Sequence, residues 1–195
     1  MSGTDTDVID ALVGITPGSA LDAIRARRPE ARAHAQATYQ ALFAPKDPGN
    51  VSASERFAVG AFVAGLHGAT AVAAAYASGA PAALKEAVDT AVKEAKTHGP
   101  YGSYTPGPLS REDTPGPVYR MEASTRRALG PRLAAAFEHA HMLVFHPRDA
   151  APAALQALLD AGWTTTDIVT LSQIVAFLSF QIRVVAGLRT LAGRA

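Results

Sequence analysis

Residues 57–84 contain no Asp, Glu, Lys or Arg, and this charge-free run limits the folds open to the chain more than any other feature. Most of the run is Ala, Gly and Val, with a polar centre at His67, Gly68 and Thr70. A membrane span needs about 20 predominantly apolar residues. Because the residues here are small and the centre is polar, burial against other helices is the better interpretation. We therefore predict one long buried helix over residues 51–77 and no membrane span.

Helix start and stop signals recur along the rest of the chain. Ser52–Glu55 and Thr164–Asp167 are capping boxes, in which a hydroxyl accepts a first-turn N–H and the acid accepts the N–H of the cap residue. Gly162 suits a helix end, and Pro131 suits a first turn. No strand pattern is found, so the sequence predicts an all-α fold, a packed helical bundle. The predicted helices cover residues 7–13, 19–28, 30–43, 51–77, 82–97, 121–129, 131–145, 153–161 and 164–188.

Residues 99–117 divide the chain, because about half of them are Gly or Pro and exclude a helix or a central strand. A loop of this length is typical of a lid, a binding loop, a subunit contact or a disordered segment. Neither flanking part has an obvious complete core. We therefore predict one all-α domain over residues 1–195, with an N-terminal half (1–98) that contains the long buried helix (52–78), and a C-terminal half (118–195). Whether the loop is a lid or a subunit contact stays open.

Composition excludes several classes of function. Lys and Arg number 18 and Asp and Glu number 17, so the formal net charge is +1 and gives no global attraction to nucleic acid or to an anionic membrane. The absence of Cys removes disulfides, thiolate metal sites and a cysteine nucleophile. The first residues, MSGTDTDVID, show neither the basic nor the apolar region of a secretory signal. A cytoplasmic location is therefore expected.

The C-terminal segment Leu158–Leu188 has a pattern shared with a known family. An Ala-Gly-Trp sequence precedes a capped turn and Asp-Ile, and an apolar helix follows. That helix carries an aromatic pair, Phe177 and Phe180, and then Gln181 and Arg183 as a Gln-x-Arg motif.

The segment 51–77 has the frame of that family's active-site helix, since it opens with a capped Ser and Glu and passes through Leu66-His67-Gly68. In this order and spacing, the two segments resemble the carboxymuconolactone decarboxylase and alkylhydroperoxidase D-like family, and they cover about a third of the chain. The resemblance implies an alkylhydroperoxidase D-like helical bundle. It also implies a homo-oligomer, because family members commonly assemble as dimers, trimers or hexamers.

The same resemblance places reactive groups at positions where this chain has inert ones. Peroxidase members carry Cys-x-x-Cys-x-x-x-His after the Gly, and a Glu about three turns earlier. One thiolate attacks the peroxide, the second thiol resolves the sulfenic acid, and Glu and His move protons. Here the two cysteines fall on Ala69 and Val72, the histidine on Tyr76 and the glutamate on Phe57. Lyase members also keep the histidine, so the resemblance predicts the scaffold, no cofactor and neither usual reaction.

His67 and Tyr76 are the candidate catalytic residues on this segment, and both are also candidate ligand-binding residues. His67 could act as a base or contact a ligand in the remnant pocket that the resemblance implies. The plainer interpretation is a buried imidazole that bonds to a carbonyl or a neighbouring helix, since no partner is visible in the sequence. Tyr76 could donate its phenol into the same pocket, or pack with its hydroxyl at the surface.

His139 and His141 complete the candidate ligand-binding set, and with Glu138 and His146 they are the densest group of potential metal ligands. Side chains at i and i+2 of a helix point about 160° apart. The two histidines therefore cannot hold one ion without a ligand from elsewhere, such as His67. We predict no metal site, and interpret the pair as one inward-facing histidine and one at a subunit contact.

Two hypotheses of different classes follow from these residues. The first is a homo-oligomeric scaffold without redox cysteines, with a structural, regulatory or ligand-binding role, and with a thiol-bearing family relative as a further candidate partner. The second is a thiol-independent enzyme of antioxidant or small-acid metabolism that uses His67, Tyr76, His139 and His141 around the remnant pocket. The two hypotheses differ in whether His67 converges with His139 or His141.

Overall fold

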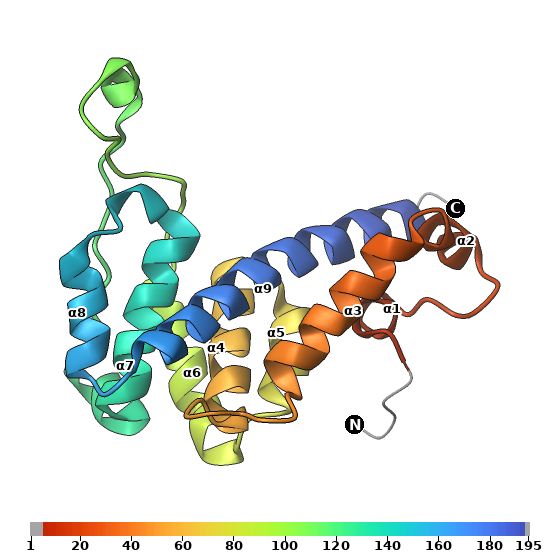
Figure 1. The fold of residues 1–195 in the computed structure, drawn as a ribbon, viewed down its shortest axis with the longest axis horizontal. Helices are drawn as coiled ribbons and strands as arrows, with labels where there is room; N and C mark the ends of the chain where they lie inside the picture. Colours follow the sequence, from red (N-terminus) through yellow and green to blue (C-terminus); the bar gives the residue numbers. More distant parts are fainter. Residues whose placement is uncertain (1–5, 194–195) are drawn as a thin grey trace.

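The computed structural model describes residues 6–193, which form a bundle of α-helices (Figure 1). The helices are α1 (Val8–Val13), α2 (Ala20–Ala26), α3 (Pro29–Phe43), α4 (Ala53–Leu66), α5 (Thr70–Ala77), α6 (Ala82–Ala95), α7 (Ala123–Phe145), α8 (Pro152–Asp160) and α9 (Thr165–Ala192). Two short 3₁₀ helices, η1 (Pro108–Glu112) and η2 (Pro147–Asp149), lie in connections. Within residues 6–193 the β structure is limited to one isolated bridge, between Gly102 and Thr114. The all-α fold class is therefore confirmed.

Helix α4 lies at the centre of the packing. It contacts α5, α6, α7 and α9, and its Phe62 is fully buried. Phe62 stacks on Phe137 of α7, with ring centroids 4.2 Å apart and ring planes 11° from parallel. In Figure 1, α9 crosses the bundle and extends along α3 toward the N-terminal helices, and contacts with α1, α2 and α3 agree with that view. The core thus draws residues from both sides of the 99–117 loop.

The helix ends follow the local signals of the sequence. The capping boxes Ser52–Glu55 and Thr164–Asp167 both form, with the hydroxyl and the acid of each bonded as predicted. Gly162 follows α8 with φ 89°, a left-handed value that costs glycine little. Gly130, with φ 80°, separates α7 into two helical parts at Pro131, so the two predicted helices over this region are confirmed.

The single helix predicted over residues 51–77 is wrong, because two helices occupy this segment. Gly68 adopts φ 69° between α4 and α5, and a glycine enters this conformation without a Cβ clash. The chain then turns and α5 packs on α4. Gly60 permits this contact, since a Cβ there would lie 2.8 Å from Cδ1 of Tyr76.

Helix α9 is apolar along its length but only partly buried. Leu171, Ile174 and Leu178 face the core, but the side chains of Val169 and Phe180 are 56% and 48% exposed. Among the described residues α9 is also the one helix long and apolar enough to cross a membrane, and half of its most apolar window is buried against the protein. A core helix of a folded domain also passes this test of length and hydropathy. The test therefore does not distinguish a membrane-spanning helix from a core helix.

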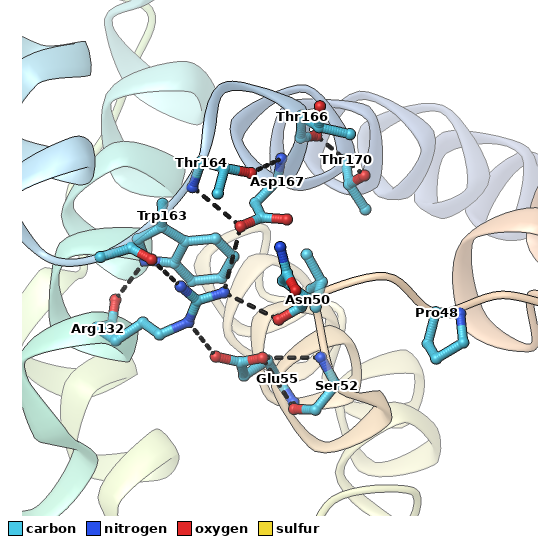
Figure 2. A network of polar contacts seen from close by, with 12 residues as sticks. Pro48, Asn50, Ser52, Glu55, Arg132, Trp163, Thr164, Thr166, Asp167 and Thr170 are labelled. Atoms are coloured by element: carbon cyan, nitrogen blue, oxygen red, sulfur yellow. Dashed lines mark hydrogen bonds and ion pairs between the residues drawn. The ribbon is translucent and has the colours of Figure 1, made fainter.

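Arg132 of α7 joins the starts of α4 and α9 (Figure 2). Its guanidinium bonds to Glu55 at 2.6 Å and lies 3.7 Å from Asp167, and these are the acids of the two capping boxes. It also lies 3.9 Å from the ring centroid of Trp163, and its other N–H groups donate to two backbone carbonyls. The indole Nε1 of Trp163 donates back to the Arg132 carbonyl at 2.9 Å. This network fixes the relative position of the helices that carry His67 and its partners.

Candidate functional site

Aromatic rings fill the region beside the segment that resembles an active-site helix. Phe43 lies at the centre, with its ring centroid 4.8 Å from that of Tyr76 and 5.4 Å from that of Phe57. Tyr39 and Phe177 extend the cluster. Phe57 and Tyr76 stand where the resemblance places a glutamate and a histidine, so both positions supply packing instead of proton transfer.

The Tyr76 hydroxyl is buried, and its predicted alternative position at the surface is wrong. The side chain is 3% exposed and donates to Oε1 of Gln181 at 2.6 Å. Burial raises the pKa of the Tyr76 phenol well above its usual range. The phenol is therefore neutral, and its one proton is used in a bond that links α5 to α9. Nε2 of Gln181 has no partner within the part of the chain that the structure describes.

His67 is half-buried at the C-terminal cap of α4, and its predicted place in the middle of a buried helix is wrong. Its Nε2 lies 3.2 Å from Oγ of Ser179 on α9. Burial, and then the charge of Arg183, lower the pKa of the His67 imidazole. The ring is therefore neutral at pH 7 and bonds to a neighbouring helix, in line with the plainer interpretation of this residue.

His67 and His139 bond to different turns of α9. Nε2 of His139 lies 3.2 Å from Oγ of Ser172, whereas His67 bonds to Ser179. Residues seven positions apart on a helix are about 10 Å apart along its axis. Tyr76 has its own separate partner on the same helix. The geometry therefore distributes these three candidates along α9 and does not gather them in one pocket.

A cavity of about 260 Å³ lies between α7, α8 and residues 118–120. His139 contributes to its wall, and so does His146, which had no predicted role beyond the candidate metal group. The apolar part of the wall consists of small or flexible side chains: Val118, Ala135, Met142, Ala151, Ala153, Ala154 and Ala157. Its other polar side chains are Arg120, Glu138 and Asp149, with Tyr119 beside them.

His146 and Asp149 form an oriented pair at the edge of this cavity. Nδ1 of His146 lies 3.1 Å from a carboxylate oxygen of Asp149, and the imidazole stacks on Tyr101 with centroids 4.9 Å apart. Asp149 also accepts from the backbone N–H of Ser103 at 2.9 Å. Gly102 makes this approach possible, since a Cβ there would lie 2.8 Å from the carboxylate. The base of the 99–117 loop therefore packs directly against the pair, while its tip extends away from the helices (Figure 1).

His141 lies behind this pair in the core. The side chain is 1% exposed, and three rings surround it, those of Tyr119, Phe145 and His146. Burial, and then the nearby His146, lower the pKa of His141 to about 4, with a hydrogen bond to the Ala95 backbone acting in the opposite direction. His139 is buried too, so the predicted subunit contact for one member of the pair is wrong. The two histidines do leave different sides of α7, but the protein covers both sides.

The described residues contain no group of three or more His, Cys, Asp or Glu side chains placed to hold one metal ion. His139 and His146 each bond to a separate oxygen, and Glu138 is engaged by arginines. The site is therefore a cavity with two imidazoles in its wall, each hydrogen-bonded to one oxygen.

No family model, curated protein or solved structure matches the chain in the comparisons made. The resemblance of residues 51–77 and Leu158–Leu188 to a known family therefore depends on the order and spacing of their residues alone.

Proposed function

We propose that this chain is an alkylhydroperoxidase D-like or carboxymuconolactone decarboxylase-like scaffold that works as a ligand-binding homo-oligomer and not as a peroxidase. One contrast carries the proposal. Two positions of the family's reactive groups, Phe57 and Tyr76, are packed in an aromatic cluster, whereas a cavity lined by His139 and His146 lies elsewhere in the bundle. Binding sites for small molecules are concave and mostly apolar, with a few placed polar groups, and this cavity has that character.

The purified protein is expected to give no thiol-dependent turnover of an organic hydroperoxide above the rate without protein. The chain has no thiol to attack the peroxide, and Tyr76 replaces the histidine that would move a proton. The measurement is hydroperoxide consumption with dihydrolipoamide as reductant, with the His67→Ala variant as a matched control. Multiple turnovers by the wild-type protein that His67→Ala abolishes would overturn the proposal and favour the thiol-independent enzyme.

Native mass spectrometry of the purified protein tests the ligand-binding part. We expect a small molecule of defined mass to be retained or taken up, at one equivalent for each chain, because the cavity between α7 and α8 has room for one small molecule. The Ala154→Leu variant is the control, since a larger side chain on α8 fills the cavity from one wall. Equal retention by wild type and Ala154→Leu would place the ligand elsewhere.

The oligomer is supported by one face of α9. Val169, Phe180 and Leu191 are its large exposed apolar side chains, and they recur every eleven residues, which places them on the same side of a helix. Phe180→Glu is expected to lower the molar mass in light scattering to that of the monomer. Leu155→Glu, at an exposed apolar residue of α8, is the control and is expected to leave the mass unchanged. A monomeric wild-type protein would contradict this part and leave the cavity proposal standing.

A thiol-independent enzyme is the second candidate, and the pair His146–Asp149 is the observation that favours it. A carboxylate that accepts from Nδ1 fixes the imidazole and leaves Nε2 able to take a proton, which is the arrangement of a general base. Loss of a measured turnover in Asp149→Asn, with ligand retention unchanged, would support this candidate over simple binding.

A further inference from the structure

We propose that α8 is a lid over the cavity between α7 and α8, and that it moves away from α7 as a unit while the rest of the bundle stays folded. The inference rests on the proposed ligand-binding function and adds the route by which a small molecule enters and leaves. It follows from the contacts that hold α8, from the backbone on either side of it, and from the cavity that it covers.

Helix α8 lies at the outer edge of the bundle and has no polar attachment to it (Figure 1). Within residues 6–193 its one side-chain hydrogen bond joins Gln156 to Asp160, inside the helix itself. Each of the other α-helices in this range has at least one side-chain hydrogen bond or ion pair with another helix. Helix α8 can therefore separate from α7 without breaking a side-chain hydrogen bond.

A single buried side chain, that of Leu158, connects α8 to the core. It is 1% exposed and is the one buried residue of the helix, whereas Leu155 and Leu159 are 45% and 38% exposed. Segments with few buried apolar contacts open locally at a lower free energy than the core. A helix as short as α8 also gains little stability from its own hydrogen bonds. Opening of α8 thus requires the loss of little more than the contacts of Leu158.

The chain before α8 is anchored and then extended. Asp149 accepts from the backbone N–H of Ser103 and from the imidazole of His146, so this end is tied to the base of the 99–117 loop. Residues 150–151 follow in an extended conformation, and no side chain caps the first turn of α8. A change in the direction of α8 at residues 150–151 leaves the anchored residues in place.

The chain after α8 has the same arrangement in reverse. Gly162 ends the helix with φ 89°, and the next residue, Trp163, is almost fully buried. Its indole donates to the carbonyl of Arg132, and the Arg132 guanidinium covers the ring. Helix α8 therefore lies between two anchored points, with a break in the helical backbone at each of its ends.

The cavity lies under the inner face of α8, so displacement of α8 opens it directly. Ala153, Ala154 and Ala157 form the α8 wall, and Ala135 and Met142 belong to the α7 wall. A volume of about 260 Å³ lies where interlocking side chains would join two packed helices. Atoms that line a cavity lack part of the dispersion contacts of a packed interface. The inner face of α8 thus loses few contacts when the helix moves away.

Hydrogen exchange of the backbone amides in the full-length protein tests the motion. The amides of residues 155–160 are expected to exchange at least about tenfold faster than those of α4. A local opening exposes little surface, so low concentrations of urea are expected to accelerate exchange in α4 and to leave α8 almost unchanged. Equal rates with an equal dependence on urea would show that α8 opens only when the whole bundle unfolds, and would overturn the inference.

Two leucines of α8 provide a matched pair of variants. Leu158→Ala is expected to accelerate exchange in α8 about thirtyfold, the equivalent of about 2 kcal/mol for a buried leucine. Leu155→Ala, the same substitution at an exposed position, is the control and is expected to keep the wild-type rate. Equal acceleration in both variants would contradict the role of Leu158. Circular dichroism checks that each variant is folded.

Val88→Ala separates opening of α8 from unfolding of the bundle. Val88 is buried on α6 and stays packed when α8 alone moves. The variant is expected to accelerate exchange in α4 about tenfold, through the loss of buried apolar groups, and to leave α8 unchanged. Acceleration of α4 and α8 by the same factor would show that they open together, which is incompatible with a lid.

A thiol on the α7 wall connects the motion to the cavity. The chain has no cysteine, so Ala135→Cys introduces a single one, in the cavity wall. Methyl methanethiosulfonate is small enough for the cavity, whereas fluorescein maleimide is larger than the cavity. Adding Leu158→Ala is expected to raise the rate with fluorescein maleimide as much as it raises exchange in α8, and to leave the rate with the small reagent unchanged. Faster exchange in α8 without faster labelling by the large reagent would show that the motion does not open the cavity.

These measurements use the free protein, so they are independent of whether a ligand is found. Local opening of α8 without a retained small molecule in native mass spectrometry would establish the motion and defeat the ligand-binding function. A retained small molecule in a protein whose α8 opens only on global unfolding would defeat the lid and leave the ligand-binding function in place.

Discussion

Arg132→Ala is expected to lower the free energy of unfolding by about 2–4 kcal/mol, because breaking a partly buried charge network leaves its partners unpaired. Glu55 and Asp167 would each lose a cation, and Trp163 would lose the guanidinium that covers its ring. Asp167 is almost fully buried, so water cannot replace the lost partner fully. Urea unfolding followed by circular dichroism measures the effect, as a lower midpoint with an unchanged m-value.

Arg126→Ala is the matched control for this prediction. Arg126 is likewise an arginine of α7 in an ion pair, but it pairs with a single acid, Glu138, and its side chain is 40% exposed. Exposed ion pairs contribute at most about 1 kcal/mol to the free energy of unfolding. Arg132→Lys adds a second comparison, since a lysine keeps the charge and loses the planar group that bonds two acids and stacks on the indole. Equal losses of unfolding free energy in Arg126→Ala and Arg132→Ala would contradict the prediction, because the contacts of Arg132 with both capping boxes would then contribute no more than an exposed ion pair.

Acidification from pH 6.5 to pH 4 is expected to reduce the free energy of unfolding by about 3 kcal/mol through His141 alone, at about 1.4 kcal/mol for each pH unit. Burial lowers the pKa of this imidazole in the folded protein to about 4, whereas the unfolded chain takes up the proton near pH 6.5. Between these values the unfolded state binds more protons, so stability is complete above pH 6.5 and falls as the pH falls. Urea midpoints measured across this range give the slope.

His141→Gln tests the assignment of that slope, since glutamine keeps a polar side chain that does not titrate. The variant is expected to start less stable than the wild type and to lose less stability between pH 6.5 and pH 4. His34→Gln, at an exposed histidine of α3, is expected to keep the wild-type slope. His67 and His139 also have lowered pKa values and contribute in the same direction, so a residual slope in His141→Gln is expected. An unchanged slope in that variant would contradict the prediction.

The sequence predicts the helix ends of this protein well, because those signals are local. A capping box needs only residues within one turn, and Gly130 followed by Pro131 determines a break whatever packs nearby. The glycine at position 68 is a possible helix end in the sequence, but the Ala-rich sequence on both sides favours continuation of a helix. Whether α5 turns back on α4 depends on tertiary contacts such as that between Gly60 and Tyr76, which no local pattern contains.

The candidate site was harder to predict for the same reason. His139 was identified from its neighbours in sequence. The orientation of His146, in contrast, depends on Asp149 and on a loop that begins more than forty residues earlier. One signal was available: a histidine and an aspartate three residues apart, with Pro147 between them to start a tight turn. Arg132 offers no such signal, because its partners come from two distant segments that meet only in the folded chain.

The break at Gly68 also determines the electrostatic environment of Ala69 and Val72. It makes Ala69 the cap and Val72 the third residue of a new helix, α5, so both positions lie where backbone N–H groups have no intrahelical partner and the helix dipole is positive. An environment of this kind favours a thiolate over a thiol. The backbone at these two positions thus favours an anionic side chain electrostatically, whereas the side chains present are methyl and isopropyl groups.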